Sequence, residues 1–180
     1  QIYKWLYTKN TRNFDEITDL SKKARDILKE KACLGGLTLI TREISNDGTE
    51  KYLFATSEGQ KVESVLMFFE DRDTHTACIS SQVGCAVGCP FCATGTLGFL
   101  KNLSAAQIAE QIQFMQSISG KRVDSVVYMG QGEPLNNYDS VVESINILSE
   151  DIGIGLRHIT VSTSGVAHRI EELGDLNLQI

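Results

Sequence analysis

Two kinds of hydrophobic spacing divide the chain near residue 73. In the first part, residues 18–21 carry helix-starting side chains, and the apolar residues after them recur at the spacing of one helix face. Runs with strand character follow at residues 37–44, 51–56 and 62–68. An Asp-Gly pair at residues 47–48 separates the first two runs and is typical of a hairpin turn. This part predicts a small helical domain (residues 1–35) and then a β-hairpin with a strand extension (residues 36–73).

The second part repeats a strand, a loop and a helix three times. The strands are expected at residues 76–80, 123–129 and 157–162. The first helix is expected to begin near Ser104, the second to span residues 141–148, and the third to contain Ile170 and Leu173. Ser104 with Gln107 has the pattern of a capping box. This alternation predicts an α/β fold with a parallel sheet and right-handed crossovers. Because parallel strands end at one edge of a sheet, the three loops that follow them are expected to face one cavity.

Composition and charge narrow the setting of this fold. The apolar runs are far shorter than the roughly 20 residues needed to span a membrane, so we expect no membrane association. The net charge of −6 argues against electrostatic binding of nucleic acid along the whole chain, because phosphate binding uses clustered Lys and Arg. Three of the five cysteines lie within residues 85–92, and no secretion signal is visible. This favours metal binding in the cytoplasm over a disulfide framework.

Cys85, Cys89 and Cys92 place three soft thiolates on the loop after the strand at residues 76–80. Such ligands select iron–sulfur clusters, zinc or copper(I). A four-iron cluster held by three thiolates leaves one iron open to a small molecule, whereas electron-transfer clusters usually have four. Three cysteines therefore predict chemistry at the open iron, with Phe91 packing beside the cofactor.

Each of these features also has a simpler explanation. The cysteines could form a structural zinc site with Cys78 as a fourth ligand, which would make the protein a non-catalytic binding module. The segment Gly132-Glu133-Pro134 could be only a turn, and Ser162 could be only a cap at the end of a strand. A strand carboxylate such as Glu63 is most often solvated.

The pattern C-x-x-x-C-x-aromatic-C, after the first strand of a βα series, resembles the radical S-adenosylmethionine (SAM) superfamily. The resemblance implies that residues 74–180 are the first part of a partial (β/α)6 barrel. It also implies that Cys85, Cys89 and Cys92 hold a [4Fe-4S] cluster whose open iron binds SAM, which is then cleaved to a radical. The superfamily has a glycine-rich loop after the second strand, and Gly132-Glu133-Pro134 matches it.

Longer stretches are similar to the RlmN/Cfr family of RNA methyltransferases. They are residues 3–7, 14–21, 47–52, 78–85, 92–95, 101–103, 129–135 and 160–165. The resemblance implies methylation of an adenine ring carbon, C2, in 23S ribosomal RNA and in some transfer RNAs. Two SAM molecules and an electron donor such as flavodoxin would take part, and a Cfr-like member would methylate C8 instead. A radical is needed because this carbon is electron-poor and not nucleophilic.

The same resemblance assigns roles to single residues. Glu63 matches the proton acceptor that completes the product. Gly132 and Glu133 match the residues that bind the methionine amino end of SAM. Ser162 matches a residue that binds near the SAM ribose.

The ends of the chain bear on this activity. The chain starts at Gln1 rather than Met, so we expect processing or truncation. It stops at Ile180, where the family continues through the rest of the barrel. The methyl-carrying cysteine of the family lies beyond that end, and none of the five cysteines matches it. We therefore expect this chain alone to lack complete methyl transfer, and we expect an RNA-binding basic surface in the continuation.

Overall fold

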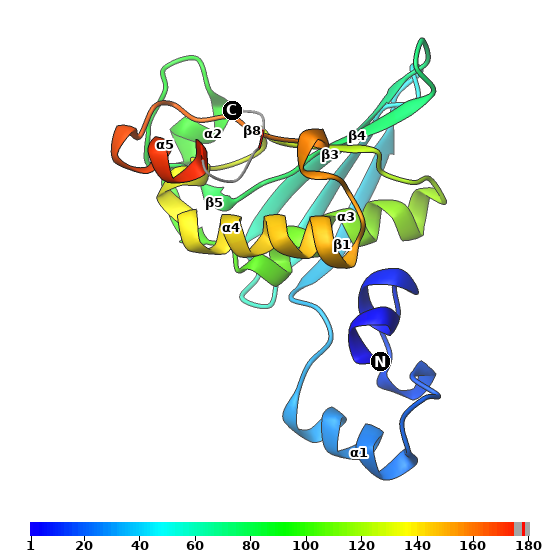
Figure 1. Ribbon diagram of the computed structural model, residues 1–180. Coiled ribbons are helices and arrows are strands. Elements are labelled where there is room, and N and C mark those ends of the chain that lie inside the picture. The colour runs from blue at the N-terminus through cyan, green and yellow to red at the C-terminus, as the bar shows by residue number, and fades with distance from the viewer. Residues whose placement is uncertain (175–177, 179–180) are drawn as a thin grey trace.

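The computed structural model describes residues 1–174 and 178, which are built around a six-stranded mixed sheet (Figure 1). The strands are β1 (Leu37–Ile44), β2 (Glu50–Thr56), β3 (Lys61–Phe69), β4 (Thr74–Cys78), β7 (Ser125–Tyr128) and β8 (Ile159–Val161). They lie in the order β1-β2-β3-β4-β7-β8, antiparallel from β1 to β4 and parallel from β4 to β8. The predicted α/β fold is therefore confirmed, and the predicted hairpin continues the same sheet as the βα units.

Helices cover one face of the sheet, and within residues 1–174 and 178 no helix covers the other face (Figure 1). The covering helices are α3 (Ala105–Ser119) and α4 (Tyr138–Asn146), and the turn η4 (Ile147–Asp151) extends α4. The predicted capping box starts α3: the Ser104 hydroxyl accepts the N–H of Gln107 (3.2 Å), and the Gln107 side chain accepts the N–H of Ser104 (3.1 Å). Strand side chains alternate between faces, so every second one is buried against these helices.

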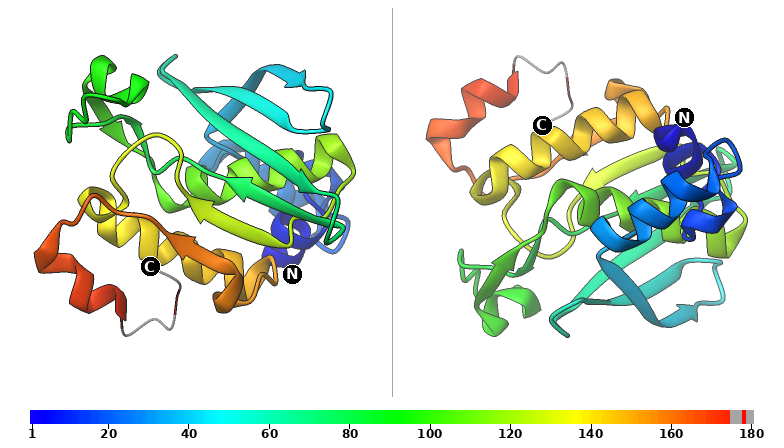
Figure 2. Two further views of the ribbon diagram at one scale, coloured as in Figure 1. Left: turned by 90° about the horizontal axis from the view of Figure 1, so that it is seen from above. Right: turned by 90° about the horizontal axis from the view of Figure 1, so that it is seen from below.

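The open face carries a row of half-buried side chains across the middle of the sheet. Strand pairing aligns Val65 of β3 with Cys78 of β4, Val127 of β7 and Thr160 of β8. The residues directly before and after each of these four are buried. The left view of Figure 2 looks onto this face, with the strands in front of the helices. The row therefore lines the side of the sheet that no helix covers in the part of the chain that is described.

The N-terminal segment forms a separate group of short helices against α3 (Figure 2). They are η1 (Lys4–Thr8), η2 (Phe14–Glu16) and α1 (Lys22–Lys31). The predicted cap of α1 is present, because the Ser21 hydroxyl accepts the N–H of Ala24 (3.2 Å). Glu110 of α3 joins this segment to the sheet: its carboxylate accepts from Arg12 (2.8 Å) and from the N–H of Gly36 (2.7 Å). One buried carboxylate thus links the N-terminal segment to both α3 and the start of β1.

The segment between β4 and α3 is more structured than the single loop predicted from the sequence. It contains β5 (Gln82–Gly84), α2 (Ala93–Leu97) and β6 (Phe99–Asn102), and β5 pairs with β6 in a second sheet. The prediction was wrong here because strands of three and four residues are too short to show a period. The remaining elements are η3 (Pro134–Asn137), η5 (Leu156–His158) and α5 (Ala167–Gly174). Within the described residues, no helix combines the length and the apolar character that crossing a membrane requires.

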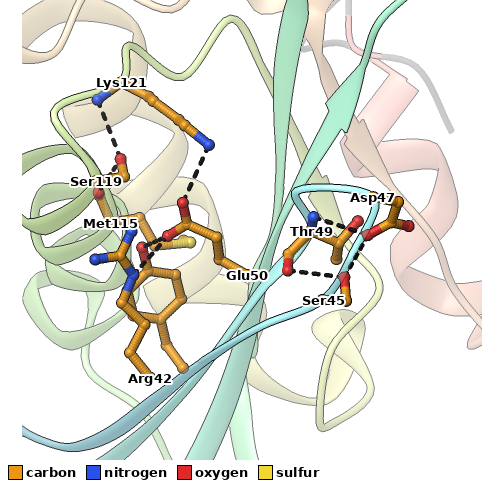
Figure 3. Close-up of polar contacts among 9 residues, drawn as sticks. Arg42, Ser45, Asp47, Thr49, Glu50, Met115, Ser119 and Lys121 are labelled. Atoms are coloured by element: carbon orange, nitrogen blue, oxygen red, sulfur yellow. Dashed lines mark hydrogen bonds and ion pairs between the residues drawn. The ribbon is translucent and has the colours of Figure 1, made fainter.

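A buried ion cluster ties the hairpin to the end of α3 (Figure 3). Glu50 is 1% exposed and accepts from Arg42 Nε (2.8 Å), from Lys121 Nζ (3.1 Å) and from the hydroxyl of Tyr52. Burial raises the pKa of Glu50, but these three donors outweigh it and lower the pKa to about 2. The same figure shows the hairpin turn, which Asp47 closes by accepting a backbone N–H (2.9 Å).

Candidate functional site

The loops that follow β4, β7 and β8 meet at one edge of the sheet, as the parallel pairing of these strands requires. The N–H of Ser81, after β4, donates to the carbonyl oxygen of Gln131, after β7 (2.9 Å). The N–H of Ser164, after β8, donates to the carboxylate of Glu133 (2.7 Å). Figure 1 shows α2 and α5 at this same end of the sheet. The structure therefore joins the three loops that carry the predicted site residues.

The cysteine loop runs from the end of β5 to the start of α2. The N–H of Cys85 donates to the carbonyl of Gly98 (3.0 Å), and the N–H of Cys92, the N-cap of α2, donates to the carbonyl of Cys89 (3.1 Å). All three cysteines are free and partly exposed. The backbone N–H of Gly95 lowers the pKa of the Cys92 thiol, which favours the thiolate that metals bind.

The chemistry of this donor set fits an iron–sulfur cluster. Three half-exposed thiols share one eight-residue loop, residues 85–92. In a four-iron cluster each thiolate binds a different iron, so the sulfurs need to surround a bulky group rather than converge on one ion. The three cysteines supply that ligand type on a loop that stays open to solvent.

Phe91, within the cysteine loop, is almost fully exposed to solvent. Its side chain is 90% exposed, and those of Leu97 and Leu100 nearby are 66% and 60% exposed. The contact between Phe91 and a cofactor therefore stays a prediction. These three exposed apolar residues and the three cysteines all lie within residues 85–100.

Packing explains the two glycines of the loop after β7. A Cβ atom at Gly130 would lie 2.5 Å from Ser80 Oγ and 2.7 Å from the carbonyl oxygen of Ile79. Gly132 has a φ of +103°, and a Cβ there would lie 2.6 Å from the Cβ of Gln82. The loop after β7 thus lies directly on the backbone that leaves β4, at a distance that only glycine permits.

The Glu133 carboxylate is buried at this edge and is occupied by hydrogen bonds from the protein itself. Glu133 is 3% exposed, and its carboxylate accepts from the N–H of Leu135 (3.0 Å), the hydroxyl of Thr163 (2.7 Å), and both the N–H (2.7 Å) and the hydroxyl (2.8 Å) of Ser164. Burial raises the pKa of Glu133, but these hydrogen bonds outweigh it and lower the pKa below its ordinary value. The side chain locks the loop after β7 to the loop after β8.

Ser162 directly follows β8 and is exposed at the same edge. The next two residues, Thr163 and Ser164, are the ones that hold Glu133. The contact of Ser162 with a SAM ribose stays a prediction. Its position beside the locked loops is compatible with that role.

Glu63 lies on β3 at the same edge as the loops. Because β3 is antiparallel to β4 and Val65 pairs with Cys78, Glu63 stands next to the residues that leave β4. Its carboxylate is 42% exposed and forms an ion pair with Lys51 of β2 (2.7 Å), which raises the pKa of that lysine. Its carbonyl oxygen accepts from the hydroxyl of Ser80 (2.6 Å). Glu63 is thus an accessible carboxylate on the open face of the sheet.

The sequence reasoning missed two buried amides that hold this edge together. Gln111 of α3 is fully buried: its Oε1 accepts from the N–H of Ser80 (2.9 Å) and the hydroxyl of Ser64 (2.5 Å), and its Nε2 donates to the carbonyl of Ser80 (2.9 Å). Asn137 donates to the carbonyl of Ser81 (2.8 Å). A glutamine inside the apolar stripe of a helix was the available signal, because a buried amide needs partners.

Comparison with known families decides what kind of protein this is. The model of the radical SAM superfamily matches residues 79–179, which is more than half of the chain. The chain belongs to the radical SAM superfamily. A second model, described as the ribosomal RNA large subunit methyltransferase N-terminal domain, matches residues 1–34. Members of this superfamily use SAM and a four-iron cluster in general, which agrees with the donor set on the cysteine loop.

Relatives extend the match over the whole chain. The probable dual-specificity RNA methyltransferase RlmN of Thermotoga neapolitana is 46% identical over 100% of this chain and 53% of its own length. The dual-specificity RNA methyltransferase RlmN of Campylobacter fetus is 43% identical over 100% of this chain and 55% of its own length. A crystal structure of a radical SAM methyltransferase from Sphaerobacter thermophilus superposes with a TM-score of 0.90 at 39% identity, covering 99% of this chain and 54% of that one. The resemblance to the RlmN/Cfr family is confirmed, and the chain spans about half the length of these proteins.

Proposed function

We propose that this chain is the first half of a radical SAM methyltransferase that modifies C2 of an adenine in 23S ribosomal RNA and in some transfer RNAs. The observation that carries the proposal is that the segment leading from β4 to the three-cysteine loop is hydrogen-bonded to the loop after β7, which Glu133 joins to the loop after β8. Two relatives named as dual-specificity RNA methyltransferases support an RNA substrate and an enzyme rather than a zinc-stabilised binding module.

Cys85, Cys89 and Cys92 would hold the [4Fe-4S] cluster, which when bound would supply the electron for cleavage of SAM. The residues of the chain then have positioning roles. The backbone around Gly132 would receive the methionine amino end of SAM, and Ser162 would lie near the ribose. Because the four hydrogen bonds to the Glu133 carboxylate come from the protein itself, Glu133 would act by holding that backbone in place.

Glu63 would accept the proton that leaves the adenine ring when the product forms. A general base must be accessible and within hydrogen-bond reach of the proton it removes. Glu63 meets the first condition, since it is 42% exposed on the open face, and the ion pair with Lys51 fixes where its carboxylate lies. The adenine would therefore approach from the face that α3 and α4 do not cover.

The rest of the reaction involves groups outside this chain. The methyl-carrying cysteine and the basic RNA-binding surface would belong to the continuation of the chain, and an external donor such as flavodoxin would supply the electron. We assign the complete protein to the cytoplasm, where ribosomal and transfer RNA are modified.

The cluster assignment is tested with two matched cysteine variants of the full-length protein, reconstituted without oxygen. The proposal predicts about four irons per chain in the wild type, as a cubane requires. Cys89→Ala should lose them, and Cys78→Ala should keep them, because burial raises the pKa of the Cys78 thiol and leaves it a poor ligand. One zinc per chain that Cys78→Ala abolishes would support the zinc-stabilised binding module instead.

The regiochemistry is tested on the product. RNA lacking the modification is incubated with the full-length protein, SAM and reduced flavodoxin, digested to nucleosides and analysed by mass spectrometry against C2-methyl and C8-methyl adenosine standards. The proposal predicts C2-methyladenosine from both ribosomal and transfer RNA. The C8 product would identify a Cfr-like enzyme.

A further inference from the structure

One serine hydroxyl bridges the two functional parts of the proposed site. Ser80 lies two residues past β4 and is fully buried. Its hydroxyl donates to the carbonyl oxygen of Glu63 (2.6 Å) and accepts from the N–H of Gln131 (2.8 Å). Glu63 lies on one side of β4 in the sheet, and the loop with Gln131 lies on the other. The hydroxyl therefore joins the strand of the proposed base to the loop of the proposed SAM site.

The surroundings of Ser80 fix this geometry. The side chain of Gln111 binds both the N–H and the carbonyl of Ser80 (2.9 Å each), so the backbone cannot turn. Gly130 leaves room for the hydroxyl, because a Cβ there would lie 2.5 Å from Ser80 Oγ. A hydroxyl has one hydrogen to donate and lone pairs to accept with, and both capacities are used here. The bridge is complete without any ligand.

Ser81 offers a matched control at the next position. It is 2% exposed, against 0% for Ser80. Its hydroxyl is buried as well, but no hydrogen-bond partner for it exists among residues 1–174 and 178. Replacing a serine by alanine at the two positions removes the same atom from the same kind of environment. Only at Ser80 does that atom connect the two parts of the site.

We propose that Ser80 is a positioning residue, whose hydroxyl holds the SAM-binding backbone after β7 and the strand of Glu63 in one fixed arrangement. The inference rests on the proposed function, because that function gives Glu63 and the loop after β7 their roles. Removal of the hydroxyl takes away the partner that Ser80 provides to the Glu63 carbonyl and to the Gln131 N–H. The loop after β7 and the strand of Glu63 are then no longer held in one fixed arrangement by a shared hydrogen-bonding group.

The first experiment compares Ser80→Ala with Ser81→Ala in full-length protein carrying its reconstituted cluster. Loss of a buried hydrogen bond corresponds to roughly fivefold to tenfold in an equilibrium constant. We expect SAM to bind Ser80→Ala weaker by about that factor, whereas Ser81→Ala stays within about twofold of the wild type. Equal SAM affinity in the two variants would overturn the proposal.

A second readout needs neither cluster nor SAM. Hydrogen–deuterium exchange of the unloaded protein should show faster exchange in the peptide that spans residues 128–134 in Ser80→Ala but not in Ser81→Ala. Unchanged exchange in this peptide would contradict the bridge directly. Should Ser80→Ala fold poorly, Ser80→Cys keeps a weak S–H donor at nearly the same volume. It should show an intermediate SAM affinity, and wild-type affinity in Ser80→Cys would count against the proposal.

A double-mutant cycle separates positioning from a general loss of structure. If Ser80 acts partly through Glu63, Ser80→Ala should lower kcat severalfold in the wild type and clearly less in a Glu63→Gln background. Equal factors in both backgrounds would refute the link to Glu63. The failure of the proposed function has a different signature, because the wild type itself would then bind neither cluster nor SAM.

Discussion

The loop after β7 and the cysteine loop lie at the same edge of the sheet, but they are held in different ways. Glu133, 3% exposed, fixes the loop after β7 through four hydrogen bonds, and Gly132 presses that loop onto the backbone that leaves β4. The cysteine loop has partly exposed thiols and a 90% exposed Phe91. Under the proposed function, the protein would prepare the SAM side of the site by itself, whereas the cluster would complete the cysteine side.

The largest expected effect distinguishes the two carboxylates of this edge. Glu133→Ala leaves four donors of the loops after β7 and β8 without their acceptor, so we expect the free energy of unfolding to fall by about 4 kcal/mol. Glu63→Ala removes one partly exposed ion pair and should lower it by less than about 1 kcal/mol. Urea denaturation of both variants measures this. Similar losses would mean that Glu133 is not the lock of the edge.

The next prediction compares one glycine from each loop. Gly132→Ala forces a Cβ to 2.6 Å from Gln82 at a φ of +103°, and we expect a loss of about 3 kcal/mol. Gly88, in the cysteine loop, also has a positive φ (+68°), but a Cβ there meets nothing within 4 Å. Gly88→Ala should therefore cost only about 1 kcal/mol. Thermal melting without a cluster gives both values, and equal melting temperatures would contradict the contrast in packing.

Glu50 provides a reference far along the hairpin from both loops. Its folded-state pKa of about 2 lies below its ordinary value of 4.5, so its stabilisation is complete above about pH 4.5 and is lost as the pH falls toward 2. The lowered pKa corresponds to a contribution of roughly 3 kcal/mol to the free energy of unfolding. Denaturation at a series of pH values should show this loss in the wild type and a flatter profile in Glu50→Gln. If stability falls with pH as steeply in Glu50→Gln as in the wild type, Glu50 is not the source of this pH dependence.

The smallest expected effect is that of Phe91. With 90% of its side chain exposed, Phe91→Ser should change the free energy of unfolding of the unloaded protein by less than about 0.5 kcal/mol. If Phe91 packs beside the cluster, the same variant should lose its iron faster on exposure to air. Following the visible absorbance of the reconstituted protein over time tests this, and identical decay would leave Phe91 without a role at the cofactor.

Hydrophobic spacing in the sequence predicted the strands of the large sheet, and the pairing of Ser104 with Gln107 predicted the helix cap. The type and spacing of the three cysteines predicted the cysteine loop. The short strands β5 and β6 could not, because three or four residues do not establish a period. The role of Gln111 was equally hidden, since its bonds go to the backbone of a residue 31 positions away. The close approach of Gly130 to Ile79 and Ser80, just past β4, was hidden as well, because it appears only once the strands are packed.

The most direct test of the account follows the two loops by hydrogen–deuterium exchange before and after the cluster is reconstituted without oxygen. We expect peptides covering residues 128–136 to be protected already in the unloaded protein and to change little. Peptides covering residues 85–95 should exchange fast without the cluster and become protected with it. Fast exchange in both loops before reconstitution, with protection gained in both afterwards, would contradict the claim that the loop after β7 is already ordered without the cluster.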